Sequence, residues 1–297
     1  EINNWMCVGV DSTHPNYTNL MGYWNLNEGI GAYTYDQTAN GNNGTLFGGT
    51  TWQVSSSCLS GAVLCGDVNE DGVLNVLDVV ILVNWVIFGN VCIDYDGNVY
   101  ETVQIGEQLW MAENLKVTHY QNSDEIPYIY NDPQYGAYIN YSNNADNVAV
   151  YGRLYNWFAV NDERGLCPDN WHVPSDDEFK SLEMYLGMSE SEANGEGLRG
   201  TDEGGKLKEE GNEHWNSPNT GATNETGFTA LPGGNRRYET YTNQEIFCCL
   251  NRYGFFWSSS EVYTVNAWYR VFSFDYSESN RYHLSKTNAF SIRCVED

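Results

Sequence analysis

Residues 67–78 have the residue types and the spacing of a calcium-binding loop. Oxygen-bearing side chains occupy positions 1, 3, 5, 9 and 12 of this segment, and glycine occupies position 6. Ca²⁺ takes about six to eight oxygen ligands, and a glycine permits the sharp turn that lets the chain surround the ion. A chance acidic turn is the alternative in a chain this rich in acids. The expected ligands are Asp67, Asn69, Asp71, the carbonyl of Val73, Asn75 and Asp78.

An apolar segment begins at the end of the loop. Residues 76–88 are almost wholly apolar and are followed by Gly89 and Asn90. This pattern predicts a short buried helix that a glycine stops. At about 13 residues the segment is too short to span a bilayer, which takes about 20 residues. We therefore expect a calcium loop and a helix that act as one unit.

Residues 66–90 resemble one repeat of a type I dockerin, which implies Ca²⁺ as a cofactor. Dockerins that bind a cohesin carry two such repeats. Here Asp94, Asp96 and Gly97 begin a similar pattern but lack the later ligands. Two roles stay open, cohesin binding and a structural calcium unit between neighbouring domains, and the single repeat favours the second.

The charge of the chain excludes several classes of partner. The net charge is −26 at pH 7, and no Lys or Arg precedes Lys116. Such a field repels phosphate backbones and anionic lipids, so we expect neither a nucleic-acid partner nor membrane insertion. The same field attracts divalent cations.

The eight cysteines predict disulfides, because the chain has no CxxC or Cys/His zinc spacing. Of the many possible pairings we expect Cys7 with Cys58, Cys65 with Cys92, and Cys167 with Cys294. The adjacent Cys248 and Cys249 are left as a vicinal bridge or as two free thiols.

The chain also has features of an extracellular protein. No apolar run is long enough for a membrane span, and no signal peptide precedes Glu1, so we expect a processed chain that is secreted or at the cell surface. Glycosylation sequons are candidates in that compartment. They begin at Asn16, Asn43, Asn140 and Asn224.

From Asp94 onward the sequence is rich in Tyr, Trp, Asn, Gly and Ser, with short strand-like runs between turn residues. This predicts a domain with many loops and little helix. One helix is expected from Asp176 to about Gly187, with Ser175 as the N-cap and Glu178 completing a capping box.

Eight ordered sequence blocks in this segment resemble the Fibrobacter succinogenes major paralogous domain, over residues 92–297. The blocks are residues 96–115, 151–157, 165–175, 205–208, 214–219, 222–234, 257–261 and 290–295. The resemblance implies a C-type-lectin-like fold in secreted and surface proteins. In that fold the two chain ends meet, which fits a bridge between Cys167 and Cys294. The sugar-binding signatures of calcium-dependent lectins are absent, so lectin activity does not follow.

Within such a fold we expect four tryptophans to be core and loop anchors: Trp110, Trp157, Trp171 and Trp215. A candidate binding face lies at residues 251–288, where Tyr, Ser, Asn, Trp and Arg gather as they do in adaptable binding surfaces. A solvated strand edge is the equal alternative, and alternation lets only about half of the side chains face one way. The candidate ligand-binding residues are Tyr253, Trp257, Trp268, Tyr269, Arg270, Tyr276 and Tyr282.

Residues 21–52 resemble the opening strands of a laminin-G-like or concanavalin-like sandwich, of which too little is present to be complete. Isolated strands expose unpaired edges. They therefore pack on the C-terminal domain, or a neighbouring subunit completes the sheet by strand addition. Head-to-tail completion of that kind does not close, and it generates fibres.

These observations predict an α+β fold, rich in strands and loops. A C-type-lectin-like domain (93–297) would follow a calcium loop-helix unit (63–92) and an incomplete sandwich-like segment (1–62). No catalytic motif is present and the five histidines are scattered, so we expect no enzyme, with a formylglycine-generating type as a minor alternative. We expect a structural or adhesive subunit of an extracellular fibre, self-associating through its N-terminal strands. The alternative is a module that binds a glycan or a protein through residues 251–288.

Overall fold

The computed structural model describes residues 91–297 apart from 132, 240 and 243, and, in the N-terminal part, residues 33–34, 40, 42 and 44–45. The chain divides into two compact units, Glu1–Ile87 and Phe88–Asp297. In the first unit, strand β1 (Tyr33–Thr34) pairs antiparallel with β2 (Gly44–Thr45). The other residues of the expected sandwich segment lie outside the described ones, so the sandwich stays a prediction.

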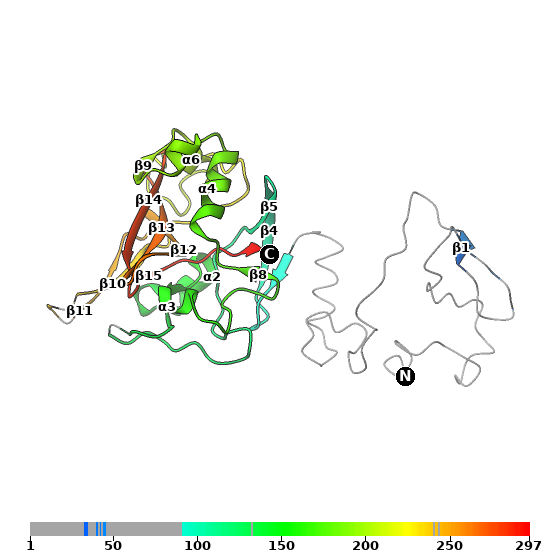
Figure 1. Ribbon diagram of the computed structural model, residues 1–297, viewed down its shortest axis with the longest axis horizontal. Helices are drawn as coiled ribbons and strands as arrows, with labels where there is room; N and C mark the ends of the chain where they lie inside the picture. Colours follow the sequence, from blue (N-terminus) through cyan, green and yellow to red (C-terminus); the bar gives the residue numbers. More distant parts are fainter. Residues whose placement is uncertain are drawn as a thin grey trace. The chain divides into compact units, whose positions relative to one another are not determined.

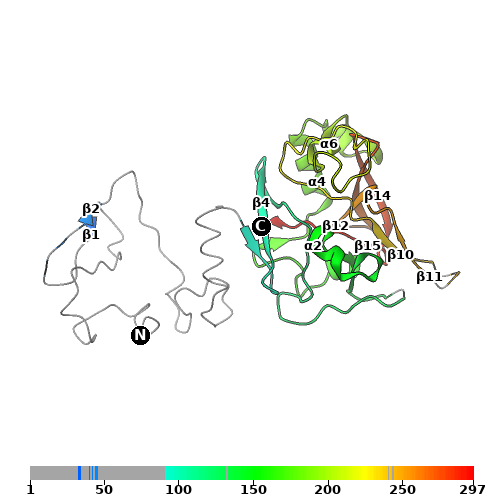
Figure 2. The same ribbon diagram turned by 180° about the vertical axis from the view of Figure 1, so that it is seen from behind.

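Residues 91–297 are built mainly from three curled antiparallel sheets (Figure 1). The first has the order β3-β4-β5-β16-β8, with bounds Val91–Ile93, Val99–Ile105, Gln108–Met111, Val295–Glu296 and Trp171–His172. The second has the order β11-β10-β15-β7-β6, with bounds Gln244–Cys248, Asn235–Glu239, Ala289–Phe290, Leu154–Asn156 and Tyr138–Ile139. The third has the order β12-β13-β14-β9, with bounds Tyr253–Tyr263, Asn266–Ser273, Ser279–Ser285 and Gly197–Arg199. Seen from behind, the hairpin of β10 and β11 projects from the body of the domain (Figure 2).

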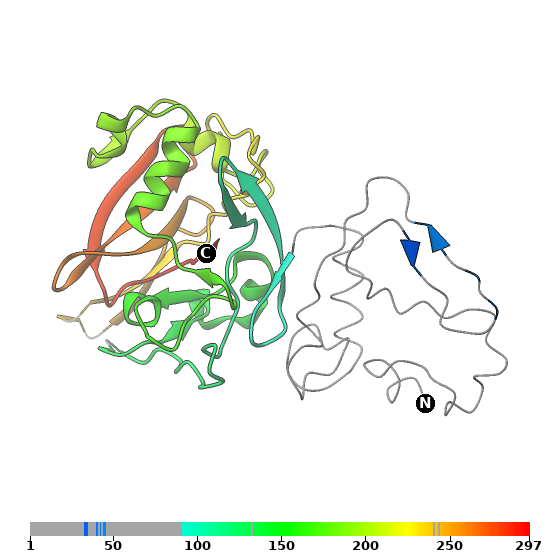
Figure 3. The ribbon, with the colours of Figure 1, turned by 45° about the vertical axis from the view of Figure 1, so that its right-hand side comes forward.

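The helices in the described residues are short. The longest, α4 (Asp176–Tyr185), begins with the expected capping box, in which Ser175 and Glu178 bond to each other's backbone N–H groups. It lies beside strands β13 and β14 (Figure 3). The others are α2 (Val148–Tyr151), α3 (Trp157–Val160), α5 (Glu190–Ala193), α6 (Glu203–Leu207) and the 3₁₀ turns η4 (Tyr141–Asn143) and η5 (Ala145–Asn147). No helix of the described part is long and apolar enough to cross a bilayer.

The expected fold class is wrong. The described domain is made mostly of strands in curled antiparallel sheets, and it is not the α+β, C-type-lectin-like arrangement that we expected. The reason lies in residues 253–273, which form two long strands, β12 and β13, that pair antiparallel with each other over most of their length. Helices stay short because turn residues interrupt them; α2, for example, stops at Gly152, whose φ is 70°. The expected calcium loop-helix unit lies outside the described residues.

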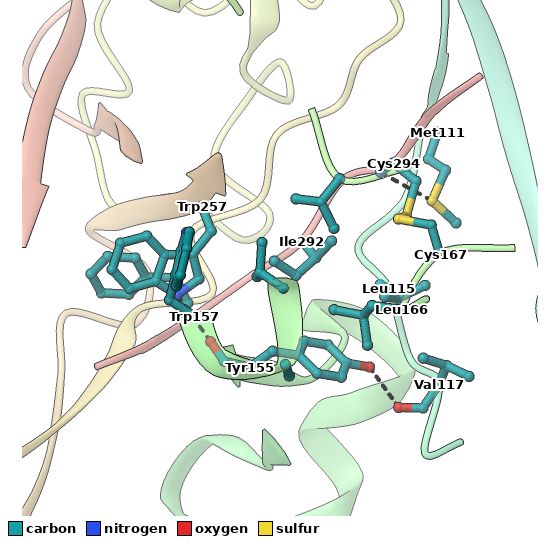
Figure 4. Close-up of a cluster of buried hydrophobic side chains, with 14 of the residues drawn as sticks. Met111, Leu115, Val117, Tyr155, Trp157, Leu166, Cys167, Trp257, Ile292 and Cys294 are labelled. Atoms are coloured by element: carbon teal, nitrogen blue, oxygen red, sulfur yellow. Dashed lines mark hydrogen bonds between the residues drawn. A yellow bond between two sulfur atoms is a disulfide. The ribbon is translucent and has the colours of Figure 1, made fainter. Parts of the chain in front are cut away.

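A hydrophobic core joins the three sheets (Figure 4). Within it the Tyr155 hydroxyl donates to the Val117 carbonyl at 2.7 Å, and the Trp257 indole donates to the Tyr155 carbonyl at 3.0 Å. The Cys167–Cys294 disulfide is part of the same core and is the pairing that we expected. The four tryptophans expected as anchors are all buried, which confirms that prediction.

Helix α4 is attached to the third sheet by charged groups that we call the buried ion cluster: Asp176, Glu183, Arg199, Arg270 and Arg281. Arg270 donates to Asp176 and to Glu183, each at 2.8 Å. Arg281 bonds to Asp176 at 2.7 Å, and Arg199 bonds to Glu183 at 2.8 Å. Burial opposes ionisation of Glu183, but the charge of Arg270 and the hydrogen bond from Arg199 hold its pKa below the usual value. Both acids of the cluster therefore have arginine partners, although the Arg199 Nε atom is buried without a hydrogen-bond partner.

Two other basic side chains, Lys208 and Arg293, bond to backbone carbonyls inside the domain. The Lys208 ammonium donates to the carbonyls of Thr220, Ser273 and Tyr276, at 2.9, 2.7 and 2.8 Å. Burial lowers its pKa to about 8. The fully buried Arg293 likewise bonds mainly to backbone carbonyls, and burial lowers its pKa to about 9. Several of the few basic side chains therefore hold the fold together and are not free to meet a ligand.

Candidate functional site

The aromatic face expected at residues 251–288 lies on strands β12, β13 and β14. These strands pair so that Trp257, Tyr269 and Tyr282 stand in one row. Trp257 is fully buried, Tyr269 is nearly so, and Tyr282 is 40% exposed. The Phe290 ring stacks on Trp257 with a centroid distance of 4.2 Å. The row thus runs from the core to the surface, and only Tyr282 can meet a ligand.

Three of the expected ligand-binding residues are therefore core residues. Trp257 and Tyr269 pack against Phe290, and Arg270 lies fully buried on the other face of β13, in the buried ion cluster. A ligand at the surface cannot reach these side chains. Placing them in the binding set was wrong, because the acids of α4 and the ring of Phe290 cover positions that look exposed in the sequence.

The other four expected residues do not form one patch. Trp268 is half-buried with the Arg281 guanidinium 3.5 Å from its ring centroid, and it faces away from Tyr282 because side chains alternate along a strand. Tyr276 is 45% exposed in the turn between β13 and β14. Tyr253 shares the face of Tyr282 but lies at the start of β12, four residues before Trp257. A single binding face at residues 251–288 is therefore not supported.

A pocket of about 610 Å³ lies on another part of the domain. Two stretches of chain line it. The first stretch, which leads into β6, contributes Glu125, Pro127, Gln134, Tyr135 and Gly136, and the second, from α3 onward, contributes Phe158, Asn161, Asp162, Glu163 and Arg164. Ligand sites have volumes of about 300–1,000 Å³, so the pocket has the size of a binding site. None of these residues was in the expected binding set.

The pairing of β6 with β7 brings the two stretches together, and one buried side chain fixes them. The Asn156 amide oxygen accepts from the backbone N–H groups of Ala137 and Ala159, at 3.0 and 3.1 Å. Its amide nitrogen donates to the Tyr135 carbonyl at 2.8 Å. Asn156 is fully buried, so these bonds are sheltered from water. It therefore sets the position of both pocket walls.

Gly136 is required where the walls come closest. A Cβ at this position would collide with the Tyr120 hydroxyl and would lie 3.0 Å from the Ala159 Cα. A larger residue would push the two stretches apart. The shape of the pocket therefore depends on a glycine at this position.

The basic group of the pocket is paired with two acidic side chains. Arg164 bonds twice to Asp162, each time at 2.8 Å, and once to Asp124 at 3.0 Å. The hydrogen bonds from Arg164 lower the pKa of both carboxyls. The guanidinium also lies 4.0 Å from the centre of the Tyr120 ring. The charge of Arg164 is therefore already compensated by Asp162 and Asp124.

The acids Glu125 and Glu163 differ from Asp162. Both are exposed at the pocket, and neither has an ion-pair partner among the described residues. Beside them are the ring of Tyr135, which is 53% exposed, and the half-buried ring of Phe158. The pocket thus offers unpaired carboxylates next to aromatic surface.

The family model of the Fibrobacter succinogenes major domain matches residues 103–296. The chain belongs to this family. The match covers the pocket, the buried ion cluster and the Cys167–Cys294 disulfide. No curated protein and no solved structure matches the chain.

Outside the pocket, the major domain has one group of described residues that could hold a metal ion. Glu209, Glu213 and His214 each offer a ligand atom within 4.8 Å of the others. The His214 Nδ1 atom already bonds to Glu209 at 2.7 Å. This hydrogen bond explains the closeness of the group without an ion.

The expected metal ligands Asp67, Asn69, Asp71, Val73, Asn75 and Asp78 lie outside the described residues, and the dockerin-like repeat stays a prediction.

Three of the cysteines, Cys7, Cys58 and Cys65, also lie outside the described residues. Cys92, the expected partner of Cys65, is buried and forms no disulfide with another described residue, so its pairing with Cys65 stays a prediction. Its side chain faces the core from β3 and packs among apolar residues. Cys248 and Cys249 form a disulfide, which decides between the two alternatives.

Two expected glycosylation sites are in the major domain. Asn140 is buried, and its amide oxygen accepts from Arg153, which is unfavourable for a glycan at this candidate sequon. Asn224 is half-buried and bonds to Thr229 through both of its amide atoms. Asn16 and Asn43 lie outside the described residues.

Little in the sequence pointed to the pocket. Its two lining stretches contain aromatic, amide and acidic residues, but the whole chain is rich in these types. Neither stretch has a helix or strand period that would orient its side chains. The useful signal would have been the β6–β7 pairing, which depends on contacts between distant residues.

Proposed function

We propose that the protein is a non-catalytic adhesive protein of the cell surface or the extracellular space, and that it binds a glycan or a protein in the pocket of the major domain. The pocket of about 610 Å³ carries this proposal. Asn156 holds its walls, and aromatic rings and polar side chains line it. Such a combination is typical of ligand sites.

A binding screen tests this proposal. The full chain would be applied to a glycan array and to a peptide array, beside Tyr135→Ala, Phe158→Ala and the control Tyr185→Ala, which is exposed on α4. We expect a ligand whose binding falls at least tenfold in the two pocket variants and stays unchanged in the control. Binding that survives in both pocket variants would contradict the proposal.

The absence of catalysis is part of the proposal. No known catalytic motif is present in the sequence. A formylglycine-generating type would need a reactive cysteine pair, and Cys248 and Cys249 are joined in a disulfide. Incubating the full chain with ester, glycoside and thiol-peptide substrates should give no turnover above buffer, and turnover with any of them would overturn this part.

The extracellular location has support from the disulfides. Cys167–Cys294 and Cys248–Cys249 are both formed, and such bonds persist in oxidising compartments. Fractionation of the source cells, with an antibody against residues 91–297, should find the protein outside the cytoplasm. Recovery from the cytoplasm alone would contradict this.

We also propose that residues 67–78 bind Ca²⁺ and stiffen the connection between the N-terminal unit and the major domain. The support is the ligand pattern in the sequence. Calorimetric titration of Ca²⁺ into the chelator-treated chain should show one site that is lost in Asp67→Ala and Asp71→Ala. The exposed Glu107→Gln, in the major domain, is the control. Equal Ca²⁺ binding by all variants would contradict the site.

A fibre subunit is the second candidate. The observation that favours it is the antiparallel pair β1–β2, which lies within the segment that resembles sandwich strands. Strand addition between chains would then give concentration-dependent assemblies that depend on Ca²⁺. Size-exclusion chromatography and negative-stain images with and without EDTA test this, and monodisperse monomers in calcium would count against fibres.

A further inference from the structure

The ligand class of the pocket follows from its charges, if the pocket is the binding site that we have proposed. Among the lining residues, Glu125, Asp162 and Glu163 face a single basic group, Arg164. Arg164 is held by Asp162 and Asp124 through three hydrogen bonds of 2.8–3.0 Å. The carboxylates of Glu125 and Glu163 are left without compensation. A ligand that adds negative charge would find no uncompensated basic group among the lining residues.

The apolar surface of the pocket is aromatic and suits a cation. Tyr135 and Phe158 present ring surface beside the unpaired carboxylates. A cation within about 6 Å of a ring centroid is attracted by the ring quadrupole, with a contribution of about 0.5–2 kcal/mol. The domain already uses this contact at Arg164, which stacks on Tyr120, and at Arg153, which lies 4.8 Å from the Tyr138 ring centroid.

The size of the pocket favours an organic cation over a metal ion. A metal ion needs several ligand atoms close together, and among the described residues that condition is met elsewhere, by the group containing His214. A volume of about 610 Å³ instead has room for a long side chain with a charged end. Lys and Arg have this form, since their apolar stems pack on rings while the charged group reaches a carboxylate.

We propose that the pocket binds a Lys or Arg side chain of a protein partner, with the charged group between Glu125 and Glu163 and the stem against Tyr135 and Phe158. The net charge of −26 would draw a basic segment toward the domain from a distance. Attraction of this kind weakens as salt screens the charges. The partner is therefore a protein with an exposed basic segment.

The test uses the full chain and three probes measured by fluorescence anisotropy. The first probe is a labelled glycine-serine peptide with two lysines and one arginine. The second is the same peptide with acetylated lysines and citrulline in place of arginine. The third is a labelled neutral oligosaccharide of glucose and galactose. The variants are Glu125→Gln with Glu163→Gln, and Tyr135→Ala.

We expect the basic peptide to bind the wild-type chain, more weakly as salt rises, and the neutralised peptide to bind at least tenfold more weakly. The double Gln variant should lose at least tenfold in affinity for the basic peptide. A control with two acids removed elsewhere, Glu107→Gln with Glu210→Gln, should lose less than twofold. This control carries the same net charge, so it separates the pocket from general attraction.

Two outcomes would overturn the proposal. They differ in whether the pocket remains a binding site. If the oligosaccharide binds, loses affinity in Tyr135→Ala and keeps it in the double Gln variant, the ligand class is wrong while the pocket remains the binding site. If the basic peptide binds all variants equally, the pocket is not its site. Failure of every ligand on the glycan and peptide arrays to respond to pocket variants would remove the proposed function itself.

Discussion

The buried ion cluster under α4 and the pocket at residues 125–164 are built from the same kinds of charged side chain, in opposite proportions. In the cluster, Arg199, Arg270 and Arg281 surround Asp176 and Glu183. In the pocket, one arginine serves two aspartates, and two glutamates have no partner. A chain with only 14 Lys and Arg against 40 Asp and Glu cannot satisfy every acid. The arginines of the cluster therefore have a structural role, whereas two exposed acids of the pocket are left without a basic partner.

The largest expected effect comes from breaking the cluster. Arg270→Met would leave Asp176 and Glu183 buried with fewer partners, and removal of one side of a buried ion pair costs about 3–5 kcal/mol. Urea unfolding followed by tryptophan fluorescence measures the loss. Arg237→Met, on the exposed side of β10, is the matched control and should change the free energy of unfolding by less than about 0.5 kcal/mol. Equal losses in the two variants would mean that the cluster is not structural.

The second largest effect on stability is expected at Asn156, which holds the pocket walls. Asn156→Ala removes three hydrogen bonds and strands the N–H groups of Ala137 and Ala159, at a cost of roughly 2–3 kcal/mol. The same unfolding assay applies, with the exposed Asn122→Ala as control. Hydrogen exchange should rise in residues 134–137 and 157–160 before other regions. Unchanged exchange there would show that Asn156 does not position the walls.

The pH dependence of stability gives a third, smaller effect near the cluster. Burial acts against ionisation of Glu178, but its hydrogen bonds with His172 and Ser175 lower its pKa from the usual 4.5 to about 2. A carboxyl with a lowered pKa in the folded state stabilises the fold above pH 4.5. This stabilisation disappears as the pH falls from 4.5 toward 2.

Glu178→Gln should therefore lower the free energy of unfolding at neutral pH and weaken its dependence on pH below 4.5. Chemical unfolding at a series of acidic pH values measures both. The exposed Glu107→Gln should keep the wild-type slope. A wild-type slope in Glu178→Gln would show that other carboxyls govern the acid response.

The smallest expected effect on stability comes from removing the two unpaired acids of the pocket, and it tests whether they differ from the acids of the buried ion cluster. Glu125→Gln with Glu163→Gln should leave the free energy of unfolding within about 0.5 kcal/mol of the wild type, because these exposed acids have no partner to lose. A small gain is also consistent, since less negative charge lowers self-repulsion. A loss of more than about 1 kcal/mol would mean that the pocket acids are structural like those of the cluster.

Local features of the fold were predictable from the sequence. The start of α4 was expected at Ser175 and Glu178, and the capping box is present. The order of eight sequence blocks predicted the family, and the family model confirms it. These predictions depend on neighbouring residues or on a pattern spread along the whole segment. For that reason they do not depend on knowing the tertiary contacts.

The burial of individual side chains was not predictable to the same degree. Arg270 and Arg281 are paired across β13 and β14, and both reach Asp176 from there. Which aromatic or basic residues turn inward depended on where α4 and Phe290 come to lie. The sheet arrangement itself was misjudged, because fold was inferred from resemblance and the pairing of strands depends on contacts over long distances in the chain. The pocket could not be predicted for the same reason, because its two walls come together only through the pairing of β6 with β7.

The last strand of the domain sets the order of events during synthesis. β16 (Val295–Glu296) pairs with both β5 and β8, and the Cys167–Cys294 bond lies next to it, with a sequence separation of 127 between its two cysteines. The first sheet therefore stays open until almost the whole domain has left the ribosome. Contacts of such long range make folding slow and expose strand edges in the meantime. We expect the first sheet and the Cys167–Cys294 bond to be completed only after synthesis of the whole domain.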